Sequence, residues 1–215
     1  MVKARRNVEA KLVPLVDCLK EATDKGRLNL NNVVADWVNL SAYTMALVNG
    51  ANLRRVSEIY ERIMEIKNKY SEKQIVLFTK ALEILGELHE RQTKDWLGQL
   101  TGVASLTENK DGQVFTPEYV AELMSELVNT TSNIQGTVSD LCCGTGALLL
   151  GHIAKVREKD KFQNIMMQAI DLDRTALLCA FIQCGLHGVN GVFMVGNTLT
   201  DEVYETFYSA PIYHF

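Results

Sequence analysis

The segment Asp140-Leu141-Cys142-Cys143-Gly144-Thr145-Gly146 contains the residues of this chain that are best suited to bind a small molecule. A short apolar run at 137–139 leads into the segment, and an apolar run at 147–150 leaves it. This pattern predicts a strand, a tight turn and the start of a helix. Gly144 and Gly146 allow the positive φ of such a turn and let backbone N–H groups approach a ligand closely.

An acidic residue further along the chain gives this turn a more specific meaning. Residues 165–170 predict a second strand, which ends in Asp171-Leu172-Asp173. An α/β sheet holds an adenosine in this way: the glycine turn lies against the ligand, and an acid after the next strand binds the ribose hydroxyls. We assign the ribose role to Asp171. Asp173 stands at a predicted helix start, so we interpret it as a helix cap.

The elements that must position these residues change in type near 107–112. Before that point, apolar residues recur at helical spacing, which predicts an N-terminal helical domain at 1–106. After it, strands alternate with helices, which predicts a second domain at 107–215 with a parallel, doubly wound sheet and an α/β fold. The predicted strands are 138–142, 165–170 and 191–195, and the predicted helices are 117–128, 146–157 and 174–187.

The composition fits an ordinary globular protein, with 47% apolar and 22% charged residues. No apolar run is long enough to span a membrane, and residues 1–11 lack the core of a signal peptide, so we expect a cytoplasmic protein without membrane contact. The five cysteines form no Cys-x-x-Cys pair. Reduced, mostly buried thiols are therefore expected, and no metal site is indicated.

The charge of the chain is unevenly distributed. The net charge is −4, and residues 112–215 carry five basic and eleven acidic side chains. A nucleic-acid-binding protein usually shows a strongly basic face, and this sequence does not. The charge therefore argues against tight DNA binding by this chain alone.

Further motifs accompany the glycine turn in a fixed order. Phe115-Thr116-Pro117 precedes it, and Leu186-His187-Gly188-Val189 and Gly196-Asn197-Thr198-Leu199 follow the acidic strand end. The series resembles the N6-adenine DNA methyltransferases, most closely the modification subunits of type I restriction–modification systems and similar enzymes of mobile elements. The resemblance covers residues from about 96 to 199, and the helices before it are similar in character to that family's N-terminal helical domain.

The resemblance implies S-adenosylmethionine as the cofactor and a Rossmann-like methyltransferase domain. Fewer strands can be placed than a complete sheet of this family needs, so we expect an incomplete sheet. The chain ends at Phe215, which suggests a truncated or minimal member of the family, or one whose missing strands another chain supplies.

The resemblance also implies roles for individual residues. Asp140 would accept a hydrogen bond from the ammonium of the cofactor, while Asn197 stands where the family usually has an Asp that binds the adenine amino group. Thr116 has two equally good interpretations, as a cofactor ligand or as the cap of the helix after Pro117. His187 is interpreted as structural. The expected cofactor-binding residues are Phe115, Thr116, Pro117, Asp140, Cys142, Gly144, Thr145, Gly146, Asp171, Leu172 and Asn197.

The catalytic tetrapeptide of the family, Asn/Asp-Pro-Pro-Tyr/Phe, does not occur in this chain. In the family, its first side chain accepts a hydrogen bond from the amino group of the flipped adenine, and its aromatic ring stacks on the base. The nearest candidate is Ala210-Pro211-Ile212-Tyr213. Pro211 and Tyr213 fit, but Ala210 supplies no acceptor, so the segment is either an eroded remnant or unrelated sequence. The catalytic residues are left unassigned.

Two functions follow from these observations. The first is an adenine-N6 DNA methyltransferase, or a fragment of a modification subunit that works with partners. The second is a non-catalytic protein that binds S-adenosylmethionine and regulates or partners a modification system. A nicotinamide-dependent oxidoreductase fits less well, because the turn lacks the third glycine of the dinucleotide fingerprint. A partner subunit and a second copy of the chain are both open as binding partners.

Overall fold

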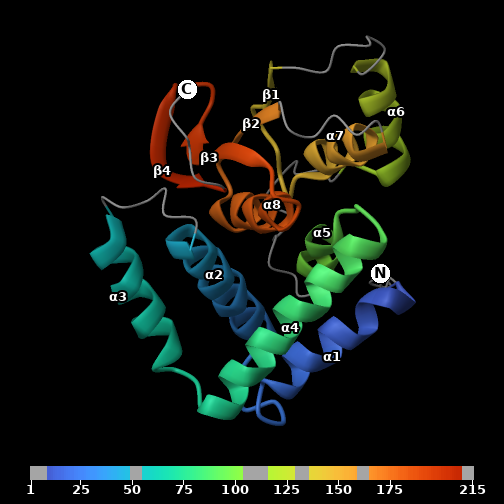
Figure 1. Cartoon of the computed structure of the whole chain (residues 1–215). Helices are drawn as coiled ribbons and strands as arrows, with labels where there is room; N and C mark the ends of the chain where they lie inside the picture. The colour runs from blue at the N-terminus through green and yellow to red at the C-terminus, as the bar shows by residue number, and fades with distance from the viewer. Residues whose placement is uncertain (1–8, 49–54, 104–115, 129–135, 159–164, 210–215) are drawn as a thin grey trace, which may run out of the picture.

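The computed structural model describes residues 9–48, 55–103, 116–128, 136–158 and 165–209 of the 215-residue chain (Figure 1). The first two ranges are helical. None of the described helices combines the length and the apolar character that a bilayer crossing requires. The helical elements are the 3-10 turn η1 (Ala10–Leu12), α1 (Val13–Glu21), α2 (Leu30–Val48), α3 (Val56–Lys67), α4 (Glu72–Arg91) and α5 (Trp96–Val103).

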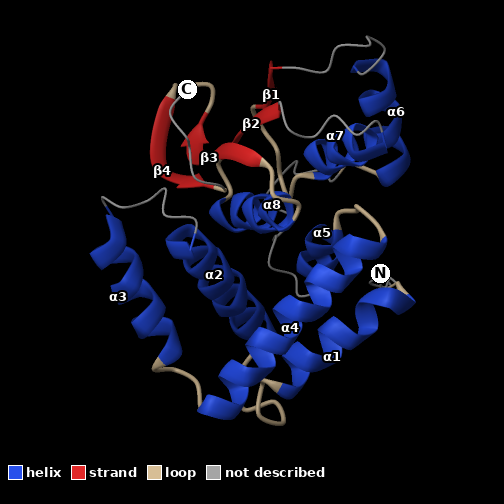
Figure 2. Ribbon diagram, viewed as in Figure 1, coloured by secondary structure: helices blue, strands red, loops and turns tan. Residues whose placement is uncertain are grey.

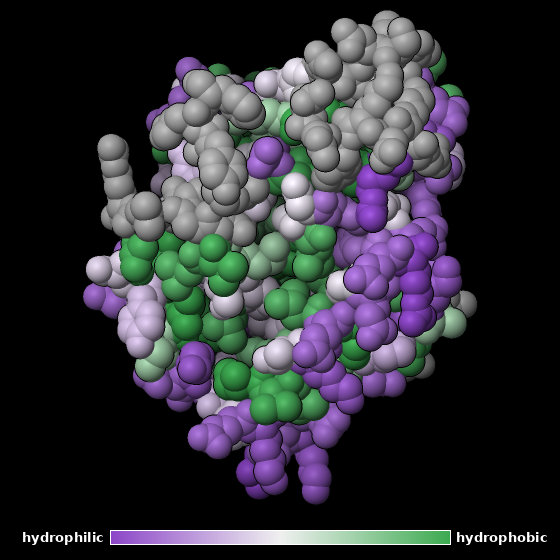
Figure 3. All heavy atoms as spheres, viewed as in Figure 1, coloured by the Kyte–Doolittle hydropathy of each residue, from purple (hydrophilic) through white to green (hydrophobic). Residues whose placement is uncertain are grey.

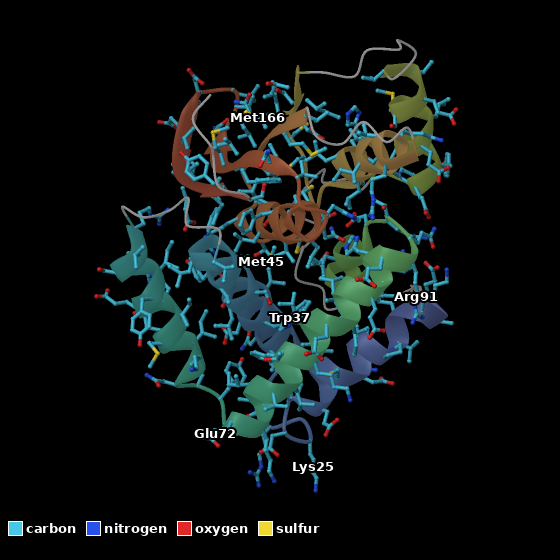
Figure 4. All side chains as sticks on the ribbon, viewed as in Figure 1. Lys25, Trp37, Met45, Glu72, Arg91 and Met166 are labelled. Atoms are coloured by element: carbon cyan, nitrogen blue, oxygen red, sulfur yellow. The ribbon has the colours of Figure 1, made fainter. Side chains whose placement is uncertain are left out.

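Helix α4 shows how the sequence fixes these elements. Ser71 and Gln74 form a capping box, in which the backbone N–H of Ser71 donates to the Gln74 side chain at 2.8 Å. The Gln74 amide also donates to the carbonyl of Ala22 just after α1, at 2.7 Å. Trp37 of α2 is fully buried and donates its indole N–H to the Phe78 carbonyl of α4 at 3.0 Å (Figure 4). These bonds hold α1, α2 and α4 together.

The rest of the described chain forms an α/β unit. Its four strands lie in the order β1-β2-β3-β4 in one sheet, and the first three are parallel (Figure 2). The expected fold class, a helical N-terminal part followed by a Rossmann-like unit with an incomplete sheet, is confirmed. The elements are α6 (Glu118–Val128), β1 (Gly136–Asp140), α7 (Ala147–Glu158), β2 (Ile165–Asp171), α8 (Arg174–Leu186), β3 (Asn190–Asn197) and β4 (Glu202–Tyr208).

Strand β4 departs from the expected parallel sheet. It pairs antiparallel with β3, with Phe193 opposite Phe207 and Asn197 opposite Glu202. The physical reason is the length of the connection: residues 198–201 are enough for a hairpin but far too few for a parallel crossover. Asp201 takes the positive φ of 57° that such a tight reversal needs.

Helix α8 lies at the centre of the molecule, between the sheet and the N-terminal helices (Figure 1). It contacts β2 and β3 on one side and α2, α4, α5 and α7 on the others. Every residue from Ala176 to Cys184 is buried, so the helix has no solvent-facing stripe. One hydrophobic core thus extends from Leu12 to Phe207. The expected boundary at 106/107 lies outside the described residues and stays a prediction.

Strand β1 forms an outer edge of the described sheet. Its one neighbour in that sheet is β2, with Val138 opposite Met167 and Asp140 opposite Ala169. Gly136, Thr137 and Ser139 are exposed. Within the described chain, β1 is therefore the least covered of the three parallel strands.

Arg174 joins the sheet to the helical part. Its guanidinium donates to Asn39 Oδ1 at 2.5 Å, to Tyr43 Oη at 2.6 Å and to Glu205 Oε2 at 2.7 Å. Glu205 also pairs with Arg55 at 3.4 Å. These residues line a cleft of about 540 Å³ between α2, α3, α8 and β4. In this cleft Arg55 pairs with Glu58, and Arg174 pairs with Glu205.

We predict that Arg174→Met lowers the free energy of unfolding by about 2 kcal/mol, because it removes the hydrogen bonds of Arg174 to Asn39, Tyr43 and Glu205 and leaves the mostly buried Glu205 with one weaker partner. Arg27→Met is the matched control, since Arg27 forms an exposed pair with Asp24, and its effect should stay below about 0.5 kcal/mol. Urea denaturation of both variants measures the difference. Equal stability of the two variants would show that the contacts of Arg174 do not stabilise the packing of β4 against the helices.

Candidate functional site

Three of the predicted ligand-binding residues lie at one edge of the sheet. Asp140 is the last residue of β1, Asp171 the last of β2 and Asn197 the last of β3. Because these strands are parallel neighbours, their carboxyl ends meet at the same edge. The structure thus brings Asp140, Asp171 and Asn197 to the same edge of the sheet, and their role in binding a ligand stays a prediction.

The glycine turn adopts the expected conformation. Gly144 and Gly146 have φ values of 54° and 93°, which favour glycine. A Cβ on Gly146 would come within 3.1 Å of the Ala180 side chain of α8, whereas a Cβ on Gly144 would meet nothing within 4 Å. Gly146 thus serves close packing, and Gly144 borders open space in which a ligand can approach the backbone.

Asp171 fastens the turn to the end of β2. One carboxylate oxygen accepts from the Gly144 N–H at 2.7 Å, and the other accepts from the Asp173 N–H at 2.8 Å. Burial raises the pKa of Asp171, and these backbone hydrogen bonds oppose that shift. Each carboxylate oxygen has a second lone pair, so the residue keeps acceptor capacity for hydroxyl groups.

Asp140 forms a hydrogen bond through one of its two carboxylate oxygens. Its Oδ1 accepts from the Cys142 N–H at 3.2 Å, while its Oδ2 is buried without a hydrogen-bond partner among the described residues. Burial raises the pKa of the Asp140 carboxyl, and the charge of nearby Asp171 raises it further. A buried carboxylate oxygen of this kind is suited to a cationic hydrogen-bond donor.

Apolar side chains surround the same edge. Leu172 follows Asp171 and is 63% exposed, and Leu141 and Leu199 are also exposed. Thr198 donates to the Leu141 carbonyl at 2.6 Å, which joins the end of β3 to the glycine turn. Asn197 Oδ1 accepts from the Leu199 N–H at 3.0 Å. The edge thus offers apolar surface beside polar acceptors, as a purine ligand requires.

Cys142 and Thr145 differ in their access to this edge. Cys142 is exposed overall. Partial desolvation of its thiol, together with the charges of Asp140 and Asp171, raises the pKa of that thiol. Thr145 is only 2% exposed, and its hydroxyl donates to Asp95 at 2.5 Å. The Thr145 side chain therefore faces the protein interior.

The remaining predicted residues are only partly described. Thr116 is half-buried, and the Pro117 carbonyl accepts from the N–H groups of Val120 and Ala121 at the start of α6. Helix α6 packs on α7, the helix that follows the glycine turn. Phe115, Pro211 and Tyr213 lie outside the described residues.

Two assignments to structural roles agree with the geometry. The Asp173 side chain accepts from the N–H groups of Thr175 and Ala176 at 2.9 and 3.2 Å, as expected for the cap of α8. His187 is the C-cap that follows α8, and its ring contacts Arg157 at 2.8 Å and the His89 ring at 3.1 Å. Within the described ranges, no group of three or more His, Cys, Asp or Glu residues is arranged to hold a metal ion.

Sequence reasoning missed Asp95 and Gln183. Gln183 Nε2 donates to Asp95 Oδ1 and to the Thr145 carbonyl, both at 2.9 Å. One signal was present: Gln183 is a polar residue inside an apolar helical run. Asp95, in a short polar stretch before Trp96, gave no comparable sign.

The sequence matches the family described as N-6 DNA Methylase over residues 84–210, which is more than half of the chain. The chain is also similar to a crystal structure of the type I restriction-modification system methyltransferase subunit from Streptococcus thermophilus, with 16% identity and a TM-score of 0.39. That similarity covers 83% of this chain but only 55% of the subunit, so the chain spans about half of the subunit's length. No curated protein matches the sequence significantly.

We predict that Asp140→Asn raises the free energy of unfolding at neutral pH by about 0.5–1 kcal/mol, because it removes a desolvated charge near Asp171. The folded-state pKa of Asp140 lies above its ordinary value of 3.8, so wild-type stability falls as the pH rises through that folded-state pKa. The advantage of the variant should therefore shrink toward pH 3.8.

Urea denaturation at neutral pH and near pH 3.8 tests this expectation. Asp17→Asn is the matched control, because Asp17 is an exposed acid on α1, paired with Lys20 at 3.7 Å. Its effect should stay within about 0.5 kcal/mol at both pH values. A less stable Asp140→Asn protein at neutral pH would contradict the assignment of a destabilising charge.

Proposed function

Because the chain belongs to the N-6 DNA Methylase family, we propose that the carboxyl edge of its sheet binds S-adenosylmethionine for the methylation of adenine N6 in DNA. The observation that carries this proposal is the buried Oδ2 of Asp140, which has no hydrogen-bond partner among the described residues and lies beside a turn with open space at Gly144. S-adenosylmethionine has an ammonium that can donate to such an oxygen, whereas a phosphate-bearing nucleotide would bring negative charge to it.

The other contacts of the cofactor follow from the same edge. Asp171 would accept from the ribose hydroxyls, and Leu172 would pack on the adenine ring. Asn197 would accept from the adenine amino group through its oxygen, which keeps one free lone pair beside the bond from Leu199. The backbone of the glycine turn would lie against the methionine part, with Thr116 and Pro117 on its other side. When bound, the cofactor supplies an electrophilic methyl group.

Two versions of this proposal differ in whether the chain transfers the methyl group. In the first, the chain transfers it to DNA together with a partner that supplies target recognition, which agrees with the acidic charge of residues 112–215. In the second, the chain only binds the cofactor and regulates a modification system. The second version is favoured by one observation, the absence of a side-chain acceptor at Ala210.

We place the partner surface on the N-terminal helices. Apolar side chains gather over α2 and α3 in the view of Figure 3. Val48, Val56 and Tyr60 of these helices are exposed, and exposed apolar groups of this kind are typical of protein interfaces. The partner would be another subunit or a second copy.

All five cysteines are free thiols, which supports a reducing, cytoplasmic setting.

We predict that the protein binds S-adenosylmethionine in calorimetric titration and does not bind NAD. Asp171→Ala should weaken the affinity at least about tenfold, because the ribose hydroxyls lose a charged acceptor. Asp17→Asn should bind like the wild type. Unchanged affinity of Asp171→Ala would refute the ribose site, and equal binding of NAD would refute the choice of cofactor.

A transfer assay tests whether this chain methylates DNA without a partner. With tritiated S-adenosylmethionine and DNA that lacks adenine methylation, we expect no transfer by the chain alone. We also expect none after Ala210→Asn, because one restored acceptor does not supply target recognition. Methylated DNA from either protein would contradict this expectation.

A further inference from the structure

A polar network joins α5 to the glycine turn and to α8. Asp95 Oδ2 accepts from the Thr145 hydroxyl at 2.5 Å, and Asp95 Oδ1 accepts from the Gly98 N–H at 2.8 Å and from Gln183 Nε2 at 2.9 Å. Gln183 completes the network by donating to the Thr145 carbonyl and accepting from the Leu97 N–H at 3.0 Å. The network thus holds both the side chain and the backbone of Thr145.

The network leaves little freedom to its members. Gln183 is fully buried, and its amide makes three hydrogen bonds within the network. Thr145 is 2% exposed. Leaving a buried polar group without its partner is costly, so a fully bonded network favours one arrangement over all others. That arrangement fixes the middle residue of the glycine turn.

Gly98 makes this close approach possible. A Cβ at position 98 would lie 2.1 Å from Asp95 Oδ2 and 2.7 Å from Thr145 Oγ1. Any side chain there would therefore separate the two oxygens that the network brings together. The requirement is local, because the glycine of α4, Gly86, has nothing within 4 Å of the equivalent Cβ position.

The two sides of the turn thus have different tasks. On the outer side, Gly144 borders open space, and its N–H is held by Asp171. On the inner side, Thr145 is held by Asp95 and Gln183. Asp95 uses both carboxylate oxygens within the protein. Because Asp95 reaches the turn through the Thr145 side chain, which is 2% exposed, it would act on a ligand at Gly144 through the shape of the turn.

We propose that Asp95 is a positioning residue for the cofactor site: it holds the glycine turn in the binding conformation through Thr145 and Gln183, without touching the ligand. This inference rests on the proposed binding of S-adenosylmethionine. It assigns a role in cofactor affinity to the N-terminal helical part of the chain, which the ligand itself does not contact.

The test combines two measurements on the full chain. Hydrogen exchange of the unliganded protein, read by mass spectrometry on a peptide that covers 141–148, reports the order of the turn. Calorimetry with S-adenosylmethionine, at a temperature where each variant is folded, reports affinity. The variants are Asp95→Ala, Asp95→Asn and Gly98→Ala, and Gly86→Ala is the matched control.

We expect Asp95→Ala and Gly98→Ala to raise exchange in this peptide and to weaken affinity about tenfold or more, while peptides of α4 stay protected. Asp95→Asn keeps one oxygen acceptor and should fall between these variants and the wild type. Gly86→Ala should match the wild type in both measurements. Gly98→Ala matters most, because it disturbs the network without removing a polar group.

The outcomes separate the two proposals. If the wild type binds the cofactor and the Asp95 and Gly98 variants bind it equally well, the positioning role is wrong and the proposed function stands. If exchange rises throughout the chain, Asp95 is a general stability residue and the positioning role is again wrong. If the wild type does not bind the cofactor, the proposed function fails, and the exchange data alone decide whether Asp95 orders the turn.

Discussion

The hydrogen bonding of one buried amide, that of Gln183, governs much of this structure. Helix α8 is buried on every side, so its single polar side chain between Ala176 and Cys184 must find all its partners within the protein. These partners come from α5 and from the glycine turn. Their relative positions are therefore set together, within the one core that the helical part and the sheet share.

The candidate site brings two partly buried carboxylates close together. Asp140 and Asp171 lie at neighbouring strand ends, and burial raises the pKa of both carboxyls. The folded state therefore contains two partly desolvated carboxylates in a region that is otherwise well bonded. Sites that are built for a ligand often carry such a local cost, because the ligand supplies the missing interactions.

The sequence was informative where structure depends on nearby residues. The strands before Asp140 and Asp171, the capping box at Ser71 and the cap at Asp173 follow from short patterns, and the structure contains all of them. The antiparallel course of β4 was missed, because the alternation of strands and helices indicated a parallel sheet. The contact of Asp95 with Thr145 was missed for a different reason: it joins residues 50 positions apart, and no local pattern encodes such a pairing.

The directions of the strands determine where a further strand can join this sheet. Strand β4 covers the outer side of β3, so a further strand that pairs parallel with β1, β2 or β3 has its place beside β1. A parallel neighbour ends at the same edge as the strand that it joins. Its last residues would thus arrive next to Asp140, whichever polypeptide contributes it. The direction of β1 therefore determines that the end of an added parallel strand would lie at the proposed cofactor site.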